Sequence, residues 1–397
     1  MKPIEIAKGF YWVGAIDWNI RDFHGYSTYE GTTYNAYLIM DEKVTLVDSV
    51  KKEFADQLIE SISTLIDPKK IEYVISNHTE MDHSGGLARV MHRVGEDKPL
   101  YCSKMGHKNL SLHFPQKWNY KPVEDGGELS IGKRTLVFME TRMMHWPDSM
   151  FTYAKEDKIL FSSDAFGQHY ASLERFDDQM GDAIMPHAKK YFANILLLYS
   201  PLILKLVEKV KSMGLALDMI CPDHGIIWRK DPMKIIQAYV EWSEQKPERK
   251  ALVVYDTMWH STEKMAEGIV EALGREGVDA KPMHLRSWHR SDIMTECLDA
   301  GAILVGSPTL NNGLFPTVSD FLTYLKGLKP LNKVGAAFGS YGWSGEAPKM
   351  VLEIMKNKVE MHVTEPPLLV NYTPDQNRLN LCRDFGKRVS ETLIHEA

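Results

Sequence analysis

The sequence ISNHTEMDHSGG, residues 75–86, holds four side chains that can bind a metal: His78, Glu80, Asp82 and His83. It directly follows the β-branched and aromatic residues 73–75, which predict a strand. A strand that ends in a turn points His78 and Glu80 the same way, and Asp82 and His83 then close the turn against them. Carboxylates gathered so closely repel one another and lose hydration unless a metal neutralises them. A polar surface turn is the alternative, but the density of ligands favours a metal site.

Three further candidate ligands lie in loops that follow predicted strands. His145 stands in MHWPD (144–148), Asp164 in SSDA (162–165) and His224 in CPDHG (221–225). Either histidine alone would more often be structural or exposed at the surface. Together with the first cluster, the three residues are predicted to complete the metal site, because such a site draws its ligands from several loops.

Composition indicates a soluble globular protein with more than one domain. The chain has 397 residues, with 44% hydrophobic and 25% charged residues and a formal charge of −6, so two domains are expected and a nucleic-acid partner is not. No apolar stretch is long enough to span a bilayer, and the N-terminus lacks the apolar core of a signal peptide. A cytoplasmic location without membrane attachment is therefore expected. The four cysteines form no C-x-x-C pair and are expected to be reduced thiols, which excludes a rubredoxin-type iron centre.

The two halves of the chain differ in their hydrophobic pattern. Residues 1–246 alternate short strands and turns with interposed helices. Residues 34–39 and 44–48 are predicted to form neighbouring strands, and a helix is predicted to begin at Asp231-Pro232. The polar stretch SEQKPERK, residues 243–250, is the best candidate for a linker. From residue 250 to residue 397, apolar runs at 251–255, 302–306, 334–338 and 368–370 alternate with helical segments. This rhythm predicts a doubly wound parallel sheet.

Three loops at the carboxyl ends of these predicted strands suit a phosphorylated flavin. Backbone N–H groups and small hydroxyl side chains at a helix N-terminus can hold the phosphate, although a capped helix start explains the first loop equally well. Aromatic rings between glycines in the third loop can lie against the flavin ring. No G-x-G-x-x-G follows a strand, so no NAD(P)H or FAD domain is expected. The candidate cofactor-binding residues are Thr257, Met258, Trp259, His260, Ser261, Thr262, Ser307, Pro308, Thr309, Leu310, Asn311, Asn312, Ser340, Tyr341, Gly342, Trp343, Ser344 and Gly345.

The metal motif resembles a known binuclear site. His-x-x-x-Asp-His followed by separated His, Asp and His is similar to the site of the metallo-β-lactamase fold. Most hydrolases of that fold carry histidine where this chain has Glu80, and a carboxylate there favours a harder, redox-active ion such as iron. The whole pattern resembles the flavodiiron proteins, of the rubredoxin:oxygen oxidoreductase type.

The resemblance implies an N-terminal metallo-β-lactamase-like αββα domain at 1–246, followed by a flavodoxin-like domain at 250–397 that binds FMN. It implies two non-haem iron ions, of which one is held by His78, Glu80 and His145 and the other by Asp82, His83 and His224, with Asp164 as the bridge. The family residue that matches His83 binds the metal or gives way to solvent. The motifs identify no catalytic residue beyond these ligands.

The function implied is reduction of O2 to water, of NO to N2O, or both. The resemblance further implies a head-to-tail homodimer, or a dimer of dimers, in which each FMN faces the irons of the partner chain. Rubredoxin is the expected electron donor, and a reduced deazaflavin is the second choice. Discrimination between the two gases is expected to rest on groups around the ligands, with His24, Tyr26, Trp146 and Tyr191 as candidates.

Two other functions are compatible with parts of the sequence. A zinc-dependent hydrolase of the metallo-β-lactamase fold with an accessory flavodoxin domain is disfavoured by Glu80 and by the flavin loops. A plain electron carrier, with the first half as a scaffold, is disfavoured because every ligand position is filled. The pair Tyr191-Phe192 fits a gas pocket, in which the Tyr191 hydroxyl donates a hydrogen bond, and fits an ordinary core helix equally well.

Overall fold

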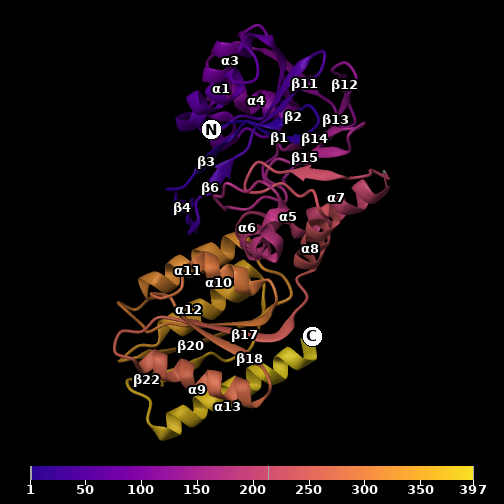
Figure 1. Cartoon of the computed structure of the whole chain (residues 1–397). Coiled ribbons are helices and arrows are strands. Elements are labelled where there is room, and N and C mark those ends of the chain that lie inside the picture. Colours follow the sequence, from indigo (N-terminus) through magenta and orange to yellow (C-terminus); the bar gives the residue numbers. More distant parts are fainter. Residues whose placement is uncertain (1, 213, 397) are drawn as a thin grey trace. The chain divides into compact units, whose positions relative to one another are not determined.

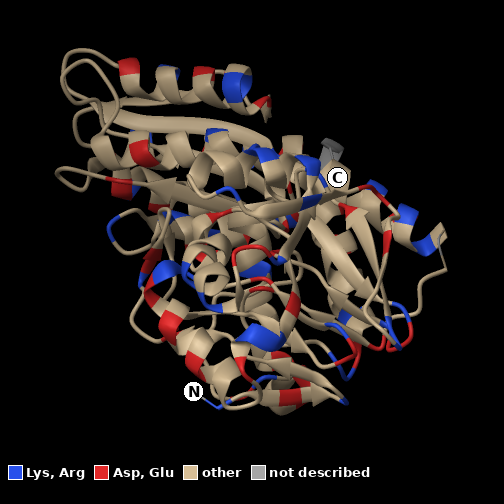
Figure 2. Ribbon diagram, turned by 90° about the horizontal axis from the view of Figure 1, so that it is seen from above, with Lys and Arg blue, Asp and Glu red and all other residues tan. Residues whose placement is uncertain are grey.

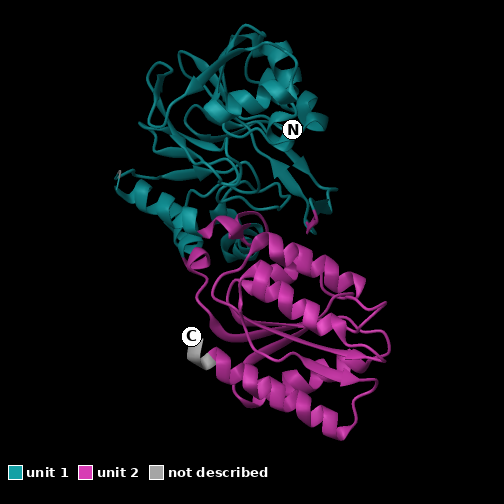
Figure 3. Ribbon diagram, turned by 180° about the vertical axis from the view of Figure 1, so that it is seen from behind, with its two compact units in different colours: residues 1–24, 28–191, 201–240 teal, residues 25–27, 192–200, 241–397 magenta. Residues whose placement is uncertain are grey.

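The computed structural model describes residues 2–212 and 214–396 (Figure 1). The chain divides into two compact units (Figure 3). Unit 1 comprises Met1–His24, Thr28–Tyr191 and Pro201–Val240, and unit 2 comprises Gly25–Ser27, Phe192–Ser200 and Glu241–Ala397. Two short segments from the first half of the chain thus belong to unit 2.

Unit 1 contains two larger β-sheets. The seven-stranded sheet has the order β1-β2-β7-β8-β9-β10-β11, with bounds β1 (Ile4–Ala7), β2 (Phe10–Trp12), β7 (Tyr37–Ile39), β8 (Val44–Val47), β9 (Ile71–Ser76), β10 (Pro99–Ser103) and β11 (Asn119–Val123). The five-stranded sheet has the order β12-β13-β14-β15-β16, with bounds β12 (Glu128–Ser130), β13 (Thr135–Glu140), β14 (Met150–Ala154), β15 (Ile159–Phe161) and β16 (Met219–Cys221). The remaining short strands are β3 (Ala15–Asp17), β4 (Asp22–Phe23), β5 (Tyr26–Ser27) and β6 (Thr32–Tyr34).

Helices cover the outer faces of these two sheets. Against the seven-stranded sheet pack α1 (Ala55–Ser63), α3 (Leu87–Val94) and α4 (Lys104–His113). The other helices of this half are α2 (Met81–Ser84), α5 (Asp177–Met180), α6 (Met185–Tyr191), α7 (Ser200–Ser212) and α8 (Pro232–Glu244). Between the sheets lies a buried core, in which Phe161 packs 5.1 Å from Tyr37 and 6.3 Å from Phe10 between ring centroids. This arrangement is the predicted αββα architecture.

The helical run at 177–212 is long and apolar enough to cross a membrane by length and composition alone. Half of its apolar window is buried inside the protein, as in the core helix of a globular domain. The run also mixes α-, 3-10 and π-helical turns. One such helix is weak evidence for a membrane span.

Unit 2 is a parallel sheet with helices on both faces, as predicted (Figure 1). The strand order is β18-β17-β19-β20-β21, and β22 also pairs with β20; the bounds are β17 (Glu248–Tyr255), β18 (Asp279–His284), β19 (Ala300–Gly306), β20 (Val334–Tyr341), β21 (His362–Val363) and β22 (Leu368–Asn371). One face is covered by α9 (Ser261–Arg275) and α13 (Gln376–Glu396), and the other by α10 (Arg290–Cys297), α11 (Pro316–Leu328) and α12 (Glu346–Ile354).

The stretch proposed as a linker, residues 243–250, is largely regular structure. Helix α8 begins at Pro232, as expected, and continues to Glu244, and β17 begins at Glu248. Only residues 245–247 lie outside both elements. Part of the polar composition arises because the start of the strand reaches solvent, where Glu248 and Arg249 are exposed. Ser243 and Gln245 of the same stretch are buried.

Acidic and basic residues are scattered over the ribbon, with both signs interspersed (Figure 2). Several form exposed ion pairs, such as Arg89 with Asp56 and Lys329 with Glu360, both at 2.7 Å. Pairs of this kind contribute at most about 1 kcal/mol each, because water screens the charges. Stability therefore rests mainly on the buried cores of the two units.

Candidate metal centre and flavin pocket

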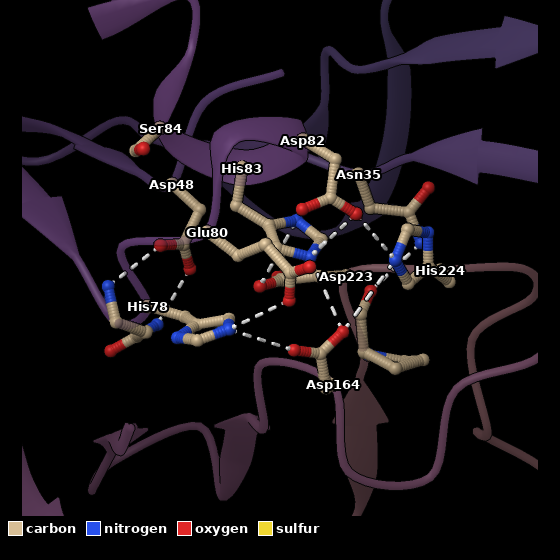
Figure 4. A network of polar contacts seen from close by, with 12 residues as sticks. Asn35, Asp48, His78, Glu80, Asp82, His83, Ser84, Asp164, Asp223 and His224 are labelled. Carbon is tan, nitrogen blue, oxygen red and sulfur yellow. Dashed lines mark hydrogen bonds and ion pairs between the residues drawn. The ribbon is translucent and has the colours of Figure 1, made fainter. Parts of the chain in front are cut away.

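The seven predicted metal ligands come together in unit 1, at the ends of strands. Figure 4 labels all of them except His145. The loop after β9 carries His78 and Glu80, and the next residues form the one-turn helix α2, which carries Asp82 and His83 where a simple turn was expected. The remaining three ligands follow β13, β15 and β16 and are His145, Asp164 and His224. Except for Glu80, which is 9% exposed, and the half-buried His145, these residues are buried nearly completely.

The ligands form two groups, and Asp164 lies between them. In the first group, the Glu80 Oε2 atom lies 3.4 Å from His78 Nε2 and 3.1 Å from His145 Nε2. The Asp164 Oδ2 atom faces the same two nitrogens, at 3.4 and 3.3 Å.

In the second group, Asp82 Oδ2 lies 3.3 Å from His83 Nε2 and 3.1 Å from His224 Nε2. The other Asp164 oxygen, Oδ1, lies 3.2 and 3.5 Å from these nitrogens. One oxygen of Asp164 is therefore directed at each group, as a bridging carboxylate requires.

Three buried carboxylate oxygens of this cluster lack a hydrogen-bond donor among the described residues. Within the described part of the chain, both oxygens of Asp82 and Oδ2 of Asp164 accept no hydrogen bond, although imidazole nitrogens lie only 3.1–3.4 Å away. A buried carboxylate without a donor is costly, and a cation between these oxygens and nitrogens removes that cost. Four imidazoles and three carboxylates are a donor set that suits two non-haem irons.

The electrostatics of the cluster also indicate a site built around positive charge. Burial alone would raise the pKa of Asp164, but the positive charges of His83 and His145 hold it well below its usual range. Burial likewise opposes protonation of His78, yet hydrogen bonding to Asp148 and Glu80 raises the pKa of His78 to about 10. Metal ions can take the place of such protons, because metal binding to histidine releases them.

Buried acceptors hold the ligand imidazoles so that each Nε2 points into the cluster. His78 Nδ1 lies 3.1 Å from Asp148 Oδ2, and His224 Nδ1 donates to the backbone carbonyl of Thr33 at 2.6 Å. Partners of this kind fix the tautomer and leave the other ring nitrogen for a metal.

His83 Nδ1 lies 3.7 Å from Asp223 Oδ2, a charge contact that is too long for a hydrogen bond. Sequence reasoning missed both Asp148 and Asp223. A signal was available, because each aspartate lies in the same short loop as a predicted ligand, within MHWPD and CPDHG.

Three of the four residues proposed to surround the ligands contact them. The Tyr191 hydroxyl donates to Asp164 Oδ1 at 2.7 Å, and burial keeps the pKa of this phenol well above its usual value. His24 Nε2 lies 3.2 Å from Glu80 Oε1, and the Trp146 ring packs edge-on 5.2 Å from the His78 ring. The hydrogen bond of Tyr191 explains why this residue is buried in the centre.

His169 was not anticipated. Its ring lies 4.7 Å from that of His224, and its Nδ1 pairs with Thr32 Oγ1 at 2.8 Å. Burial and the neighbouring His224 lower the pKa of His169 well below its usual value, so the ring is neutral. Nothing in the local sequence distinguishes it from a surface histidine.

Unit 2 contains a cavity of about 420 Å³ formed by the three predicted flavin loops. The predicted residues that line it are Met258, Trp259, Ser261, Pro308, Thr309, Leu310, Asn311, Asn312, Ser340, Tyr341, Gly342, Trp343 and Ser344. Tyr372, which follows β22, also lines the cavity and was missed, although it lies directly beyond a predicted strand end. The volume and the aromatic walls fit a flavin.

The five other predicted residues do not line the cavity. Thr262 Oγ1 pairs with Ser340 Oγ at 2.9 Å and joins the first and third loops. Ser307 accepts the Phe315 N–H, and His260 pairs with Glu263. At Gly345 a Cβ atom would lie 2.6 Å from Leu369. These residues shape the loops.

Thr257 supplies the test of fit for a phosphate. Its side chain is buried, and its Oγ1 has no hydrogen-bond partner among the described residues. It lies just before α9, whose first residue, Ser261, lines the cavity. A free hydroxyl beside a helix N-terminus suits a phosphate group, because both provide donors to an anion. The loops therefore fit FMN.

Comparison with known proteins agrees with this architecture. The model of the ODP family beta lactamase matches residues 32–225, and that of flavodoxin matches residues 253–386. A rubredoxin-oxygen oxidoreductase of Megalodesulfovibrio gigas is 49% identical over 89% of both chains. A nitric oxide reductase of Moorella thermoacetica is 46% identical over 98% of both, and a coenzyme F420H(2) oxidase of Methanothermobacter marburgensis is 40% identical over 97% of both.

Solved structures give the same result. The rubredoxin oxygen:oxidoreductase of Desulfovibrio gigas superposes with a TM-score of 0.97 at 44% identity, covering 100% of this chain and 99% of the other. The flavodiiron protein of Giardia intestinalis gives 0.95 at 34% identity, covering 100% and 98%.

The fold and the site define an oxidoreductase in which a metallo-β-lactamase-like domain with a binuclear iron site is joined to an FMN-binding flavodoxin domain. Relatives of nearly full length that share this organisation establish a narrower assignment. The chain belongs to the flavodiiron protein family. The predicted fold and family are thereby confirmed, and the zinc hydrolase alternative is not supported.

Proposed function

We propose that this flavodiiron protein reduces O2 to water, NO to N2O, or both, using electrons that pass from FMN to the di-iron centre. The observation that carries the proposal is the pair of ligand groups with one Asp164 oxygen directed at each. Relatives with the same two-domain organisation are named for O2 and for NO, which supports both gases as substrates.

The ligands are assigned from the two groups. His78, Glu80 and His145 would hold one iron, Asp82, His83 and His224 would hold the other, and Asp164 would bridge them. The presence of Asp223 beside His83 Nδ1 supports His83 as a ligand, since a carboxylate there would orient the ring. Iron supplies open positions where a diatomic gas can bind, and flavin supplies the electrons.

The chain itself positions these ligands and limits access of water. Asp148 accepts the Thr79 N–H at 2.8 Å, which holds the carboxylate in place, and the His78 ring cannot rotate without loss of its contact with that carboxylate. Tyr191 stays protonated, and its hydroxyl donates a hydrogen bond to Asp164 Oδ1. Burial of nearly every ligand excludes bulk water, which strengthens each charged contact.

The purified, iron-loaded and FMN-loaded protein is expected to consume O2, NO or both when it is supplied with reduced rubredoxin. Gas electrodes for the two substrates, used side by side on one preparation, give the rates and the preference. A preparation reconstituted with zinc is the control and is expected to consume neither gas, because zinc has no redox chemistry. An iron-loaded, FMN-loaded protein that consumed neither gas would contradict the proposal.

The electron donor is proposed to be rubredoxin, with a reduced deazaflavin as the second choice. Relatives named for rubredoxin and for coenzyme F420H(2) support these two donors. We propose a cytoplasmic location for the protein together with these donors.

A head-to-tail homodimer, or a dimer of dimers, is proposed as the working form, with each FMN facing the irons of the partner chain. Two large aromatic side chains at the flavin cavity, Trp259 and Trp343, are 86% and 87% exposed. Exposed aromatic surface of this kind is typical of an interface.

Mixing two inactive variants tests the dimer. One variant lacks iron and keeps FMN, and the other lacks FMN and keeps iron. After subunit exchange, half of the dimers contain one chain of each kind, and one of their two FMN–iron pairs is complete, so activity is expected to recover to about a quarter of wild type. Each variant subjected to the same exchange alone is the control. If subunit exchange is verified and the mixture still shows no activity, the head-to-tail arrangement is contradicted.

A further inference from the structure

An apolar cavity of about 80 Å³ lies in unit 1 between the five-stranded sheet and helices α7 and α8. Phe151 of β14 and Leu160 of β15 contribute from the sheet face opposite to the core between the sheets. Ile203 and Val207 contribute from α7, and Ile236 from α8. The volume is several times the roughly 10–15 Å³ that one water-sized molecule needs.

The cavity has almost no partner for water. Of the described side chains that line it, only Lys211 and Tyr239 carry a polar group. Lys211 is exposed to solvent, and the Tyr239 hydroxyl already accepts the Phe166 N–H at 2.7 Å. Part of the cavity rim reaches the surface at Lys211 and Met233. Because an ordered water needs two to four polar partners, the apolar interior still suits small apolar molecules better than water.

The wall of the cavity is continuous with the backbone of two metal ligands. Met144 lines the cavity and directly precedes His145, and Ala165 and Phe166 line it and directly follow Asp164. A molecule in the cavity is therefore separated from the ligand cluster by a single layer of residues.

Phe166, which forms part of that layer, is firmly held. Its carbonyl accepts hydrogen bonds from Gln168 Nε2 at 2.8 Å and from Trp228 Nε1 at 2.9 Å. Its ring packs 4.6 Å from that of Tyr239. The cavity is thus a fixed feature of the wall beside the metal centre.

We propose that this cavity is a binding site for a small uncharged gas, O2 or NO, from which the metal centre is supplied. The proposal rests on the proposed function for the identity of the gas. Both molecules are uncharged diatomics, which an apolar cavity accepts more readily than water or ions. A gas site beside the metal centre raises the local concentration of substrate and so lowers the KM for the gas without changing the chemical step.

Xenon is the probe, because it reports on an apolar site without being turned over. Crystals of the iron- and FMN-loaded protein under xenon pressure are expected to show xenon in the cavity. Val207→Phe is expected to fill the cavity and abolish the xenon site. The KM for the gas in this variant is expected to rise about threefold or more, while kcat at saturating gas stays unchanged. This pattern indicates that binding of the gas is weakened and that the chemical step is intact.

The matched control is Leu202→Phe, which adds a ring on the same helix at a position 39% exposed and outside the cavity. It is expected to keep both the xenon site and the wild-type KM. Ile203→Phe fills the cavity from another position and serves if Val207→Phe does not fold.

A wild-type cavity that remained empty under xenon would overturn the proposal, and so would a filled cavity with an unchanged KM. Xenon in the cavity of a protein that consumed neither gas would establish the apolar site and contradict the proposed function instead.

Discussion

Asp164→Ala is expected to strip the protein of iron and to reduce gas consumption by more than the roughly 10–100-fold that loss of an outer-shell partner costs. The reason is geometric, because its two oxygens face different ligand groups, at 3.3–3.4 Å on one side and 3.2–3.5 Å on the other. Removal of the carboxylate leaves four imidazoles with only Glu80 and Asp82 to balance the charge of the metal. Iron per chain and the rates with O2 and NO are the measurements.

Two controls accompany this substitution. The FMN content is expected to stay at the wild-type level, since the flavin cavity lies in unit 2 and uses none of the metal ligands. Asp178→Ala removes an aspartate whose partner is Arg229, at 2.9 Å near the surface of unit 1, and is expected to keep both iron and activity. An Asp164→Ala protein that retained both irons and full turnover would show that this residue is no bridge.

Ser261→Asp is expected to weaken FMN binding by about a hundredfold or more, since placing like charges together costs several kcal/mol and 1.4 kcal/mol is a factor of ten. Ser261 is the first residue of α9 and lines the flavin cavity, so the new carboxylate would oppose the phosphate at the helix N-terminus. The fold is expected to tolerate the change, because an acidic side chain in the first turn stabilises a helix by roughly 0.3–1 kcal/mol. Flavin titration monitored by fluorescence gives the dissociation constant.

Ser261→Ala separates loss of the hydroxyl from addition of the charge. It removes one hydrogen-bonding group and is expected to weaken binding by about tenfold or less, since one such bond contributes about 1 kcal/mol. Iron content is expected to be unchanged in both variants. Equal affinity of Ser261→Asp and wild type for FMN would place the phosphate away from the start of α9.

Sequence patterns identified the strands whose apolar residues pack in the core of the sheet to which they belong. The predicted strand at 44–48 became β8, and the apolar run at 251–255 lies within β17. The run at 34–39 was predicted as one strand but divides into β6 and β7 at Asn35. There the Asn35 side chain accepts the Trp12 indole N–H and donates to the carbonyls of Pro222 and Gly225. No local pattern could reveal contacts that join positions so distant in the sequence.

The same distinction applies to the metal site. The clustering of the seven candidate ligands was predictable, because each stands in a loop after a strand and their order matches a family pattern. The residues that orient them were not: Thr33 acts through its backbone carbonyl, and Asp148 faces a histidine from a different loop. The Tyr191 hydroxyl illustrates an intermediate case, since the residue was singled out but its contact with Asp164 required the fold.

All four cysteines, Cys102, Cys221, Cys297 and Cys382, are buried free thiols. Burial raises their pKa, to about 12 for Cys102 and Cys297 and to about 11 for Cys382, and raises that of Cys221 well above its ordinary value. Oxidants attack the thiolate, a form that these groups scarcely populate at neutral pH. The protein, for which reduction of O2 is one proposed activity, thus offers that oxidant no readily ionised thiol among these four cysteines.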